Sequence, residues 1–293
     1  REDAYDMLSA EAGDAGLLFV TTPSLMNTVL RFALEHPSCL TLVYSRMQHH
    51  YRLHTYFGRY YEAVFLCGVV AGQHTKTGTV AYITPKLSYA RFTSDINAFA
   101  IGVHSVRPDA RVLVVTRDVD PKQMETCEFG VRHAASLGAD TVLTPHYSHL
   151  TLAELPYGIF TALIGIDQEG KPTRYLAAPD WNWERFYTAM VKSYLNGSLS
   201  ALLAMDREES PIANFWWGLG GGVVDVRLGS WSSGTPNNLI RYLRGSIARN
   251  LYNPFHGPVT DSEGVVRVPA HSDAPPADII KMRYIVEGVE IIE

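Results

Sequence analysis

Short apolar runs alternate with amphipathic segments along most of the chain. Apolar runs of about four to eight residues are typical of buried strands, whereas apolar positions three and four residues apart are typical of helices. The pattern predicts helices over 2–12, 24–35, 61–73, 92–105, 124–137 and 181–195. It predicts strands over 16–22, 40–44, 79–83, 111–115, 141–143, 158–166 and 174–178. Strands that alternate with helices in this way indicate an α/β protein.

One helix separates most successive strands, which favours a mostly parallel sheet built from right-handed crossovers. These units are too many for one sheet, and 293 residues suggest about two domains, so we expect two Rossmann-like lobes. Ser24 is placed to cap the second helix and Gly138 to end the fifth. The chain after residue 246 is expected to be rich in loops.

Composition and charge exclude several classes of protein. With 46% hydrophobic and 19% charged residues, the chain has enough apolar material for a sizeable core and is not a disordered tail. The net charge is −5 and no basic run is present, which argues against nucleic acid as a partner of this region. The longest nearly apolar stretch, 60–72, is interrupted by Glu62 and is too short to span a bilayer.

Three local patterns are candidate sites of chemistry. The glycine-rich stretch 218–222 is followed by a strand-like run rather than a helix, so a flexible turn is favoured over a nucleotide loop. His49, His50 and His54 lie in a segment expected to be irregular, and a surface loop is favoured over a metal site. Cys39, Cys67 and Cys127 are far apart, which indicates buried free thiols rather than a zinc or redox motif.

No nucleophile with its base can be recognised from the spacing of Ser, His and Asp, and no GxSxG, HExxH or P-loop pattern occurs. The sequence therefore favours a protein that is not an enzyme, with no cofactor and no metal.

Aromatic residues and one aspartate are the remaining candidates for ligand binding. Aromatic faces can stack on a planar ligand or a sugar ring, or they can fill the packing between lobes. The tryptophans all fall between residues 181 and 231: Trp181, Trp183, Trp216, Trp217 and Trp231. Asp167 ends the apolar run 160–166, where its carboxylate either accepts hydrogen bonds from a diol or forms a turn.

Ten short segments carry a family resemblance: YEA at 61–63, CGVVAG at 67–72, TKTGTV at 75–80, INAFAIG at 96–102, GAD at 138–140, GID at 165–167, NW at 182–183 before FY at 186–187, GVVD at 222–225, PFHGP at 254–258 and VRVP at 266–269. In this order they resemble the basic membrane protein family (Bmp, PnrA-like) of solute-binding proteins. The resemblance spans nearly the whole chain from about Tyr5.

The resemblance implies the type I periplasmic-binding-protein fold, with two Rossmann-like lobes joined by crossing strands. The first lobe would comprise 1–78 with a return segment at about 179–215, and the second 79–178 with a return segment at about 222–293. Hinge closure would grip a small polar solute in an interlobe cleft. That solute would be a purine nucleoside, a nucleobase or a similarly flat metabolite, delivered to an ABC permease as the partner.

The resemblance also assigns ligand-binding positions. The family aspartate that holds the ribose matches Asp167. A family lysine corresponds to Trp181 and a stacking phenylalanine to Val119, and these two departures weaken the case for a nucleoside. Trp183 and His146 would line or close the site.

Two further polar residues are second-tier candidates. Asp225 and Asn97 fall within resemblance segments, and a structural role at the crossing and at a helix start is favoured for both.

Family members open with a βα unit that this chain does not show, and the resemblance implies that an N-terminal remainder of the parent protein supplies it. A subgroup of the family places a Bmp-like region behind another N-terminal domain. Two localisations follow: extracytoplasmic and membrane-associated, as in the lipoprotein family, or cytoplasmic. The alternative function is a cytoplasmic ligand sensor with the same fold, and a nucleoside hydrolase is the third.

Overall fold

The computed structural model describes residues 2–47, 50, 52–85, 93–117, 125–145, 161–205, 213–230 and 235–293. They form two compact units, here called unit 1 (Arg1–Arg59 and Asn182–Trp217) and unit 2 (Tyr60–Trp181 and Gly218–Glu293). The chain therefore passes from one unit to the other three times. The first boundary was expected near residue 78, but it lies before Tyr60, because the helix that begins there packs within unit 2.

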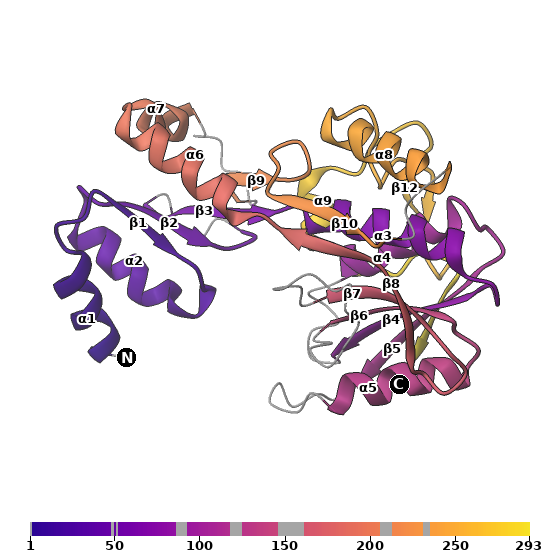
Figure 1. Ribbon diagram of the computed structural model, residues 1–293. Helices are drawn as coiled ribbons and strands as arrows, with labels where there is room; N and C mark the ends of the chain where they lie inside the picture. Colours follow the sequence, from indigo (N-terminus) through magenta and orange to yellow (C-terminus); the bar gives the residue numbers. More distant parts are fainter. Residues whose placement is uncertain are drawn as a thin grey trace. The chain divides into compact units, whose positions relative to one another are not determined.

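Unit 1 is a four-stranded parallel sheet with the order β1-β2-β3-β9 and helices on both faces. Its strands are β1 (Leu17–Val20), β2 (Leu40–Tyr44), β3 (His54–Gly58) and β9 (Phe215–Trp217). Its helices are α1 (Glu2–Ala12), the 3-10 helix η1 (Pro23–Leu25), α2 (Met26–Glu35), α6 (Trp183–Leu195) and α7 (Ser198–Met205). Helices α1 and α2 cover one face of the sheet and α6 the other (Figure 1).

The amphipathic pattern of α2 is confirmed. Val29, Phe32 and Ala33 are buried at the expected spacing, and two of them join the apolar cluster with Val43 of β2. The expected cap is wrong: Thr22 is the capping residue of η1, and its Oγ1 accepts the backbone N–H of Ser24 at 3.2 Å. Serine and threonine both cap helices, and the insertion of one 3-10 turn shifts the cap by two residues.

Unit 2 is built on a seven-stranded sheet with the order β10-β8-β7-β6-β4-β5-β13 and a separate β11-β12 pair. Its strands are β4 (Thr79–Pro85), β5 (Arg111–Arg117), β6 (Thr141–Pro145), β7 (Thr161–Ile166), β8 (Pro172–Trp181), β10 (Val224–Leu228), β11 (Val259–Thr260), β12 (Val266–Val268) and β13 (Val289–Ile292). Its helices are α3 (Tyr60–His74), α4 (Thr93–His104), α5 (Glu125–Ser136), α8 (Thr235–Ala248) and α9 (Pro276–Lys281).

Only part of this sheet is parallel. Strands β6, β4, β5 and β13 pair in parallel, whereas β7, β8 and β10 join by antiparallel pairings. The sequence predicts a mostly parallel sheet, but the parallel part ends at β6, and a tight turn from Asp167 to Gly170 connects β7 to β8. A short turn can join antiparallel neighbours, whereas parallel strands need a long crossover.

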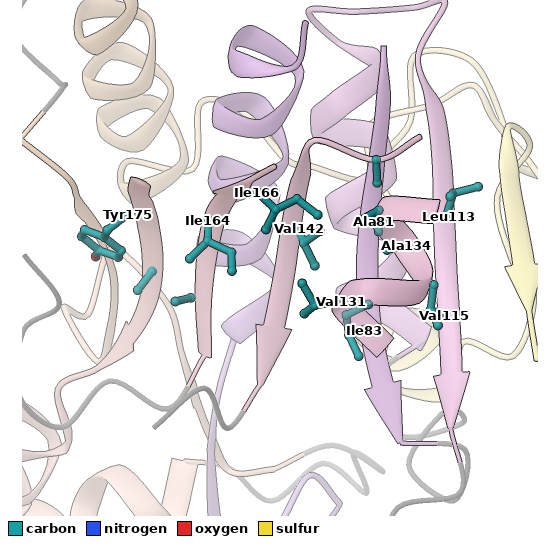
Figure 2. Packing of buried hydrophobic residues seen from close by; sticks show 14 residues of the cluster. Ala81, Ile83, Leu113, Val115, Val131, Ala134, Val142, Ile164, Ile166 and Tyr175 are labelled. Atoms are coloured by element: carbon teal, nitrogen blue, oxygen red, sulfur yellow. The ribbon is translucent and has the colours of Figure 1, made fainter. Parts of the chain in front are cut away.

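The cluster between α5 and the unit 2 sheet is mainly aliphatic. Figure 2 shows Val131 and Ala134 of α5 facing Ile83 of β4 and Val115 of β5, within one buried cluster. The residue Gly138 ends α5 as expected, with φ +94° and the N–H of Ala139 bonded to the carbonyl of Ala134. Helices α3 and α4 bury nearly every residue on the opposite side of the sheet.

Glycines allow α3 and α4 to approach each other closely. A Cβ atom on Gly68 would lie 2.2 Å from the carbonyl oxygen of Phe99, and one on Gly102 would lie 2.2 Å from that of Phe65. The two glycines therefore form a reciprocal contact between the helix backbones. Both belong to segments that carry the family resemblance, and their role is packing.

Several short elements were not predicted. Strand β3 contains His54, so this residue is not in a surface loop, and β9 is only three residues long. The C-terminal region beyond residue 246 contains α9 and three short strands besides its loops. Within the described residues, no helix is both long and apolar enough to cross a membrane.

Candidate ligand-binding site

One face of the unit 1 sheet carries a group of aromatic rings. Tyr44 lies opposite Tyr56, and Tyr56 lies opposite Phe215, so their side chains project from the same face. Helix α6 covers this face with rings of its own. The aromatic cluster comprises Phe19, Tyr44, Tyr56, Trp183, Phe186, Tyr187, Phe215 and Trp217.

The centre of the aromatic cluster is a stacked pair. The rings of Tyr56 and Phe186 lie 4.6 Å apart at 22°, and both side chains are fully buried. The Tyr56 hydroxyl donates to the carbonyl of Val20 at 3.2 Å and lies 3.2 Å from the Tyr187 hydroxyl. Burial, followed by the Tyr187 hydroxyl, raises the pKa of Tyr56 well above its usual range, so its hydroxyl stays protonated.

Trp183 and Tyr44 bring the aromatic cluster to the edge of the sheet where the parallel strands end. Tyr44 is the last residue of β2 and Trp183 the first of α6, and their rings meet edge to face at 5.6 Å. Both side chains are only half-buried. In open α/β sheets, ligands bind outside the carboxyl ends of the strands, so this edge is the candidate ligand-binding site.

Asp167 has a structural role in a turn. Its Oδ1 accepts the backbone N–H groups of Glu169 at 3.0 Å and Lys171 at 2.8 Å, which fixes the β7–β8 connection. Moreover, Gly165 lies opposite Thr141, the first residue of β6. Asp167 therefore lies at the edge where β6 begins, and the premise that it follows a parallel strand is wrong. The sequence leaves two roles open for Asp167, binding a diol or forming a turn, and these contacts describe the turn.

Trp181 and Trp183 belong to different units. Trp181 ends β8 in unit 2, where its ring stacks on Tyr60 at 4.6 Å with an interplanar angle of 7°. The Tyr60 hydroxyl donates to the carbonyl of Pro179 at 3.4 Å, and burial raises the pKa of Tyr60. The stacked pair thus holds the end of β8 against the start of α3.

Asp225 and Asn97 both have structural partners, and their ligand roles stay predictions. Asp225 in β10 forms a bidentate ion pair with Arg244 of α8. Asn97 is fully buried, donates to the carbonyl of Tyr284 at 2.9 Å and accepts the N–H of Val286 at 3.1 Å.

Four residues singled out from the sequence cannot be placed. His49, Val119, His146 and Trp231 lie outside the described residues.

The glycine-rich stretch 218–222 is a turn that leads into β10, as expected. The backbone N–H of Leu219 donates to the buried carboxylate of Glu62 at 2.8 Å, and Gly222 has φ +67°. No group of three potential metal ligands occurs among the residues that the structure describes. The three cysteines are buried there without a disulfide, and burial raises the pKa of each thiol.

Two cavities lie within unit 2, and no sequence-predicted ligand residue that the structure describes is among their lining residues. The larger, about 950 Å³, lies in the C-terminal region between residues 261 and 291, with Arg267 and Tyr284 among its walls. The smaller, about 410 Å³, is lined by His74, Lys76 and Arg174 among others. The larger is built from one stretch of the chain, whereas the smaller combines residues from 74 to 176.

The sequence singled out Trp183 but missed its neighbours. Strand register brings Phe19, Tyr44 and Tyr56 together, and Tyr187 lies four residues after Trp183 on the same helix. Two local signals are available in the sequence: the spacing of four residues between Trp183 and Tyr187, and the alternation of Phe215 and Trp217 along one strand.

Comparisons with known proteins agree on the family and the fold. Residues 5–120 match the Bmp family, described as ABC transporter substrate-binding protein PnrA-like. The resemblance proposed from the sequence is confirmed over this range.

Two curated relatives are similar at low identity. A purine-binding protein of Brucella abortus is 23% identical over 287 residues, which cover 96% of this chain and 77% of its own length. A protein named as an ABC transporter glucose-binding protein of Haloferax volcanii is 26% identical over 194 residues, which cover 64% of this chain and 48% of its own.

Two solved structures share the fold at 11% identity. An ABC transporter solute-binding protein of Conexibacter woesei has a TM-score of 0.58 over 86% of this chain and 82% of its own. A transcriptional activator of the comK gene from Bacillus halodurans has a TM-score of 0.59 over 86% of both chains. The fold is that of the type I periplasmic-binding proteins, as predicted. The closure of two lobes around a ligand stays a prediction.

Proposed function

From the Bmp match over residues 5–120, we propose that this chain is the substrate-binding component of an ABC transporter and binds a flat polar solute without transforming it. The observation that carries the proposal is the aromatic cluster of unit 1. Trp183 and Tyr44 are half-buried at the carboxyl edge of a parallel sheet, where a solute ring can stack on them.

The buried part of the aromatic cluster supports this role by holding the exposed rings in place. Trp183 contacts Tyr56 at 5.5 Å and Tyr187 at 6.2 Å, so both its face and its edge are packed against rigid neighbours. A preorganised ring loses little conformational freedom when a ligand stacks on it. The ring of Tyr44 is also held in place, because it packs on the ring of Phe57 at 5.0 Å.

The chemistry of the site fits nucleobases, nucleosides and sugars, since the faces of all three pack against aromatic rings. The names of the two curated relatives mention a purine and glucose, which belong to these classes of solute. The proposal does not use Asp167 as the ligand carboxylate, because its Oδ1 already accepts two backbone N–H groups. We place the protein on the extracytoplasmic side, with an ABC permease as its partner.

The proposal is tested by comparing the native and denatured masses of the purified protein, followed by calorimetric titration with hypoxanthine, inosine and glucose. We expect a mass excess that matches one bound solute, or saturable binding of at least one of the three. Every solute should be recovered unchanged, because the function is binding. Cleavage of inosine would instead support a nucleoside hydrolase, and absence of binding by all solutes would overturn the proposal.

Two tryptophan variants localise the binding. Trp183→Leu should weaken solute binding by about tenfold, which corresponds to about 1.4 kcal/mol. Trp216→Leu is the matched control, because Trp216 lies opposite Phe57 and projects from the other face of the same sheet. Equal affinities of the two variants would contradict a ligand site at Trp183.

A further inference from the structure

The smaller cavity of unit 2, about 410 Å³, lies where α3 ends and where the strands β7 and β8 meet β6. Its walls include His74, the last residue of α3, together with Lys76 and Arg174. Every residue that lines it belongs to unit 2. The cavity is therefore separate from the residues proposed to bind the transported solute, which belong to unit 1.

Gly165 leaves open space in one wall of the cavity. It lies opposite Arg174 in the antiparallel pair of β7 and β8. A Cβ atom on Gly165 would lie 3.9 Å from the Cβ of Arg174 and 3.1 Å from the hydroxyl oxygen of Thr173. The side chains of Arg174 and Thr173 thus begin on the face of the sheet where Gly165 has no side chain, and both residues line the cavity.

The positive charge of Arg174 acts on the cavity wall. Burial, followed by the guanidinium of Arg174, lowers the pKa of His74, so the guanidinium lies near the imidazole. Arg174 is exposed, and within the residues that the structure describes its guanidinium forms no ion pair and no hydrogen bond. The guanidinium is therefore available to a ligand.

Lys76 supplies a second cation to the same cavity. Its backbone is fixed, because its N–H donates to Oδ2 of Asp140 at 2.7 Å. Its side chain is exposed, and the ammonium group has no ion pair or hydrogen bond in the described part of the chain. The same holds there for the hydroxyl of Thr173. The cavity thus combines two cations and one hydroxyl group that can all donate hydrogen bonds to a ligand.

One carboxylate, that of Asp140, also lines the cavity, but it is occupied by the fold. Its Oδ1 accepts the hydroxyls of Thr75 at 2.7 Å and Thr141 at 3.1 Å, and its Oδ2 accepts the N–H groups of Lys76 and Thr77 at 2.7 and 3.0 Å. A carboxylate that accepts four hydrogen bonds does not need Lys76 or Arg174 as a partner. The two cations therefore leave the cavity with a surplus of positive charge.

A phosphate group fits this set of donors. Guanidinium and ammonium groups both pair with phosphate oxygens through charge-assisted hydrogen bonds. A phosphate group offers three or more acceptor oxygens that point in different directions, so it can contact donors from different strands and loops at once. The volume of the cavity is that of a small-molecule site, which leaves room for the carbon part of a phosphomonoester.

We propose that this cavity is a second ligand site, which binds a phosphate group, free or as a small phosphomonoester, through Arg174, Lys76 and the hydroxyl of Thr173. This site goes beyond the proposed function, because it uses none of the residues proposed to bind the transported solute.

Calorimetric titration of the full chain tests the site with three probes: inorganic phosphate, glycerol 3-phosphate and glycerol. At low ionic strength, at least one of the two phosphate compounds should bind saturably, whereas glycerol should not bind. The variant Arg174→Gln should weaken the binding of phosphate about tenfold, because it removes a charged hydrogen-bond donor. Lys76→Gln should weaken it by several-fold for the same reason.

Lys171→Gln is the matched control. Lys171 lies in the β7–β8 turn, its side chain is 75% exposed and pairs with Glu169 at 3.4 Å, and it does not line the cavity. This variant removes the same charge from the same unit and should leave the affinity for phosphate unchanged. If Arg174→Gln unfolds, Arg174→Lys, which keeps the charge, should retain part of the affinity.

Three results would overturn the proposed phosphate site. The first is that neither phosphate compound binds. The second is that Lys171→Gln weakens binding as much as Arg174→Gln, because binding would then follow net charge alone. The third is that Trp183→Leu weakens the binding of phosphate and Arg174→Gln does not.

The phosphate site and the proposed function can fail separately. Binding of phosphate without binding of hypoxanthine, inosine or glucose would overturn the proposed function and leave the phosphate site standing. Binding of one of these three solutes without binding of either phosphate compound would do the reverse.

Discussion

The sheets of the two units are covered by different side chains. In unit 2, mainly Val, Ala, Ile and Leu side chains pack between α5 and the sheet, and the buried rings, such as Phe65 and Phe99, lie on α3 and α4. Unit 1 uses a similar aliphatic cluster under α2, but it fills the opposite face of its sheet with eight aromatic rings. Aliphatic cores are common packing, whereas half-buried rings at a strand edge can also contact a ligand.

The segments that carry the family resemblance lie mostly in unit 2, and their side chains serve the fold. The carboxylate of Asp140 accepts the hydroxyl of Thr75 at 2.7 Å and the backbone N–H groups of Lys76 and Thr77 at 2.7 and 3.0 Å. Glu62 holds the glycine-rich turn in the same manner. These contacts of Asp140 and Glu62 stabilise unit 2, whereas the half-buried rings of unit 1 are the ones proposed to bind the solute.

The largest effect is expected at the centre of the aromatic cluster. Phe186→Ala removes a fully buried ring that packs on Tyr56, Phe215 and Trp217, so the free energy of unfolding should fall by about 3–5 kcal/mol. This fall in the free energy of unfolding is measured by urea unfolding. Phe129→Ala is the control, because the Phe129 side chain is 49% exposed on α5, and its change should stay near 1 kcal/mol or below. Equal losses would contradict a packed aromatic core.

A smaller loss of stability is expected at Gly68, where α3 and α4 of unit 2 approach each other closely. Gly68→Ala introduces a methyl group 2.2 Å from the carbonyl oxygen of Phe99, which forces α3 and α4 apart and should lower stability by about 1–3 kcal/mol. Gly245→Ala in α8 has no such neighbour and should be neutral or stabilising by about 0.5–1 kcal/mol, because alanine favours helices. The stabilities of the two variants are compared by thermal unfolding. A neutral Gly68→Ala would contradict the close backbone contact.

The smallest effect concerns a single carboxylate of unit 2 and depends on pH. Burial of Asp261 would by itself raise its pKa, but the N–H groups of Val265 and Glu263 and the Arg267 guanidinium hold that pKa below its usual range. Its contribution to stability is therefore present at neutral pH and is lost as the pH falls through this lowered pKa. Asp261→Asn should be less stable than the native chain at neutral pH.

The difference between Asp261→Asn and the native chain should disappear in acid, as measured by urea unfolding across the pH range. A difference that stays constant with pH would contradict the role of the ionised carboxylate.

The periodic elements of the fold could be predicted from the sequence. The apolar spacing of α2 and the nearly continuous apolar run of α3 place both helices within a residue or two of their observed ends. The antiparallel pairing of β7 with β8 can be read from the predicted strands 158–166 and 174–178, because the seven residues between them are too few for a crossover. A carboxylate after an apolar strand can form a turn or bind a ligand. Asp167 forms a turn, because the chain returns to β8 directly after it.

The candidate site was predicted only in part. Trp183 was named from the sequence, but Tyr44 and Tyr56 were not, because β3 is short and begins at His54 within a histidine-rich stretch. Trp181 and Trp183 are two residues apart, yet they belong to different units, since the chain crosses between them. Trp181 and Trp183 are therefore close in sequence but belong to different units. Tyr44, Tyr56 and Phe215 are far apart in sequence, but the strand register places them next to one another.

The most direct test of the account is a crystal structure of the protein with the solute that binds most tightly among hypoxanthine, inosine and glucose. The account predicts a solute ring packed on Trp183 or Tyr44 at the carboxyl edge of the unit 1 sheet. A solute bound in the 950 Å³ cavity of the C-terminal region, or on the Asp167 turn, would contradict it.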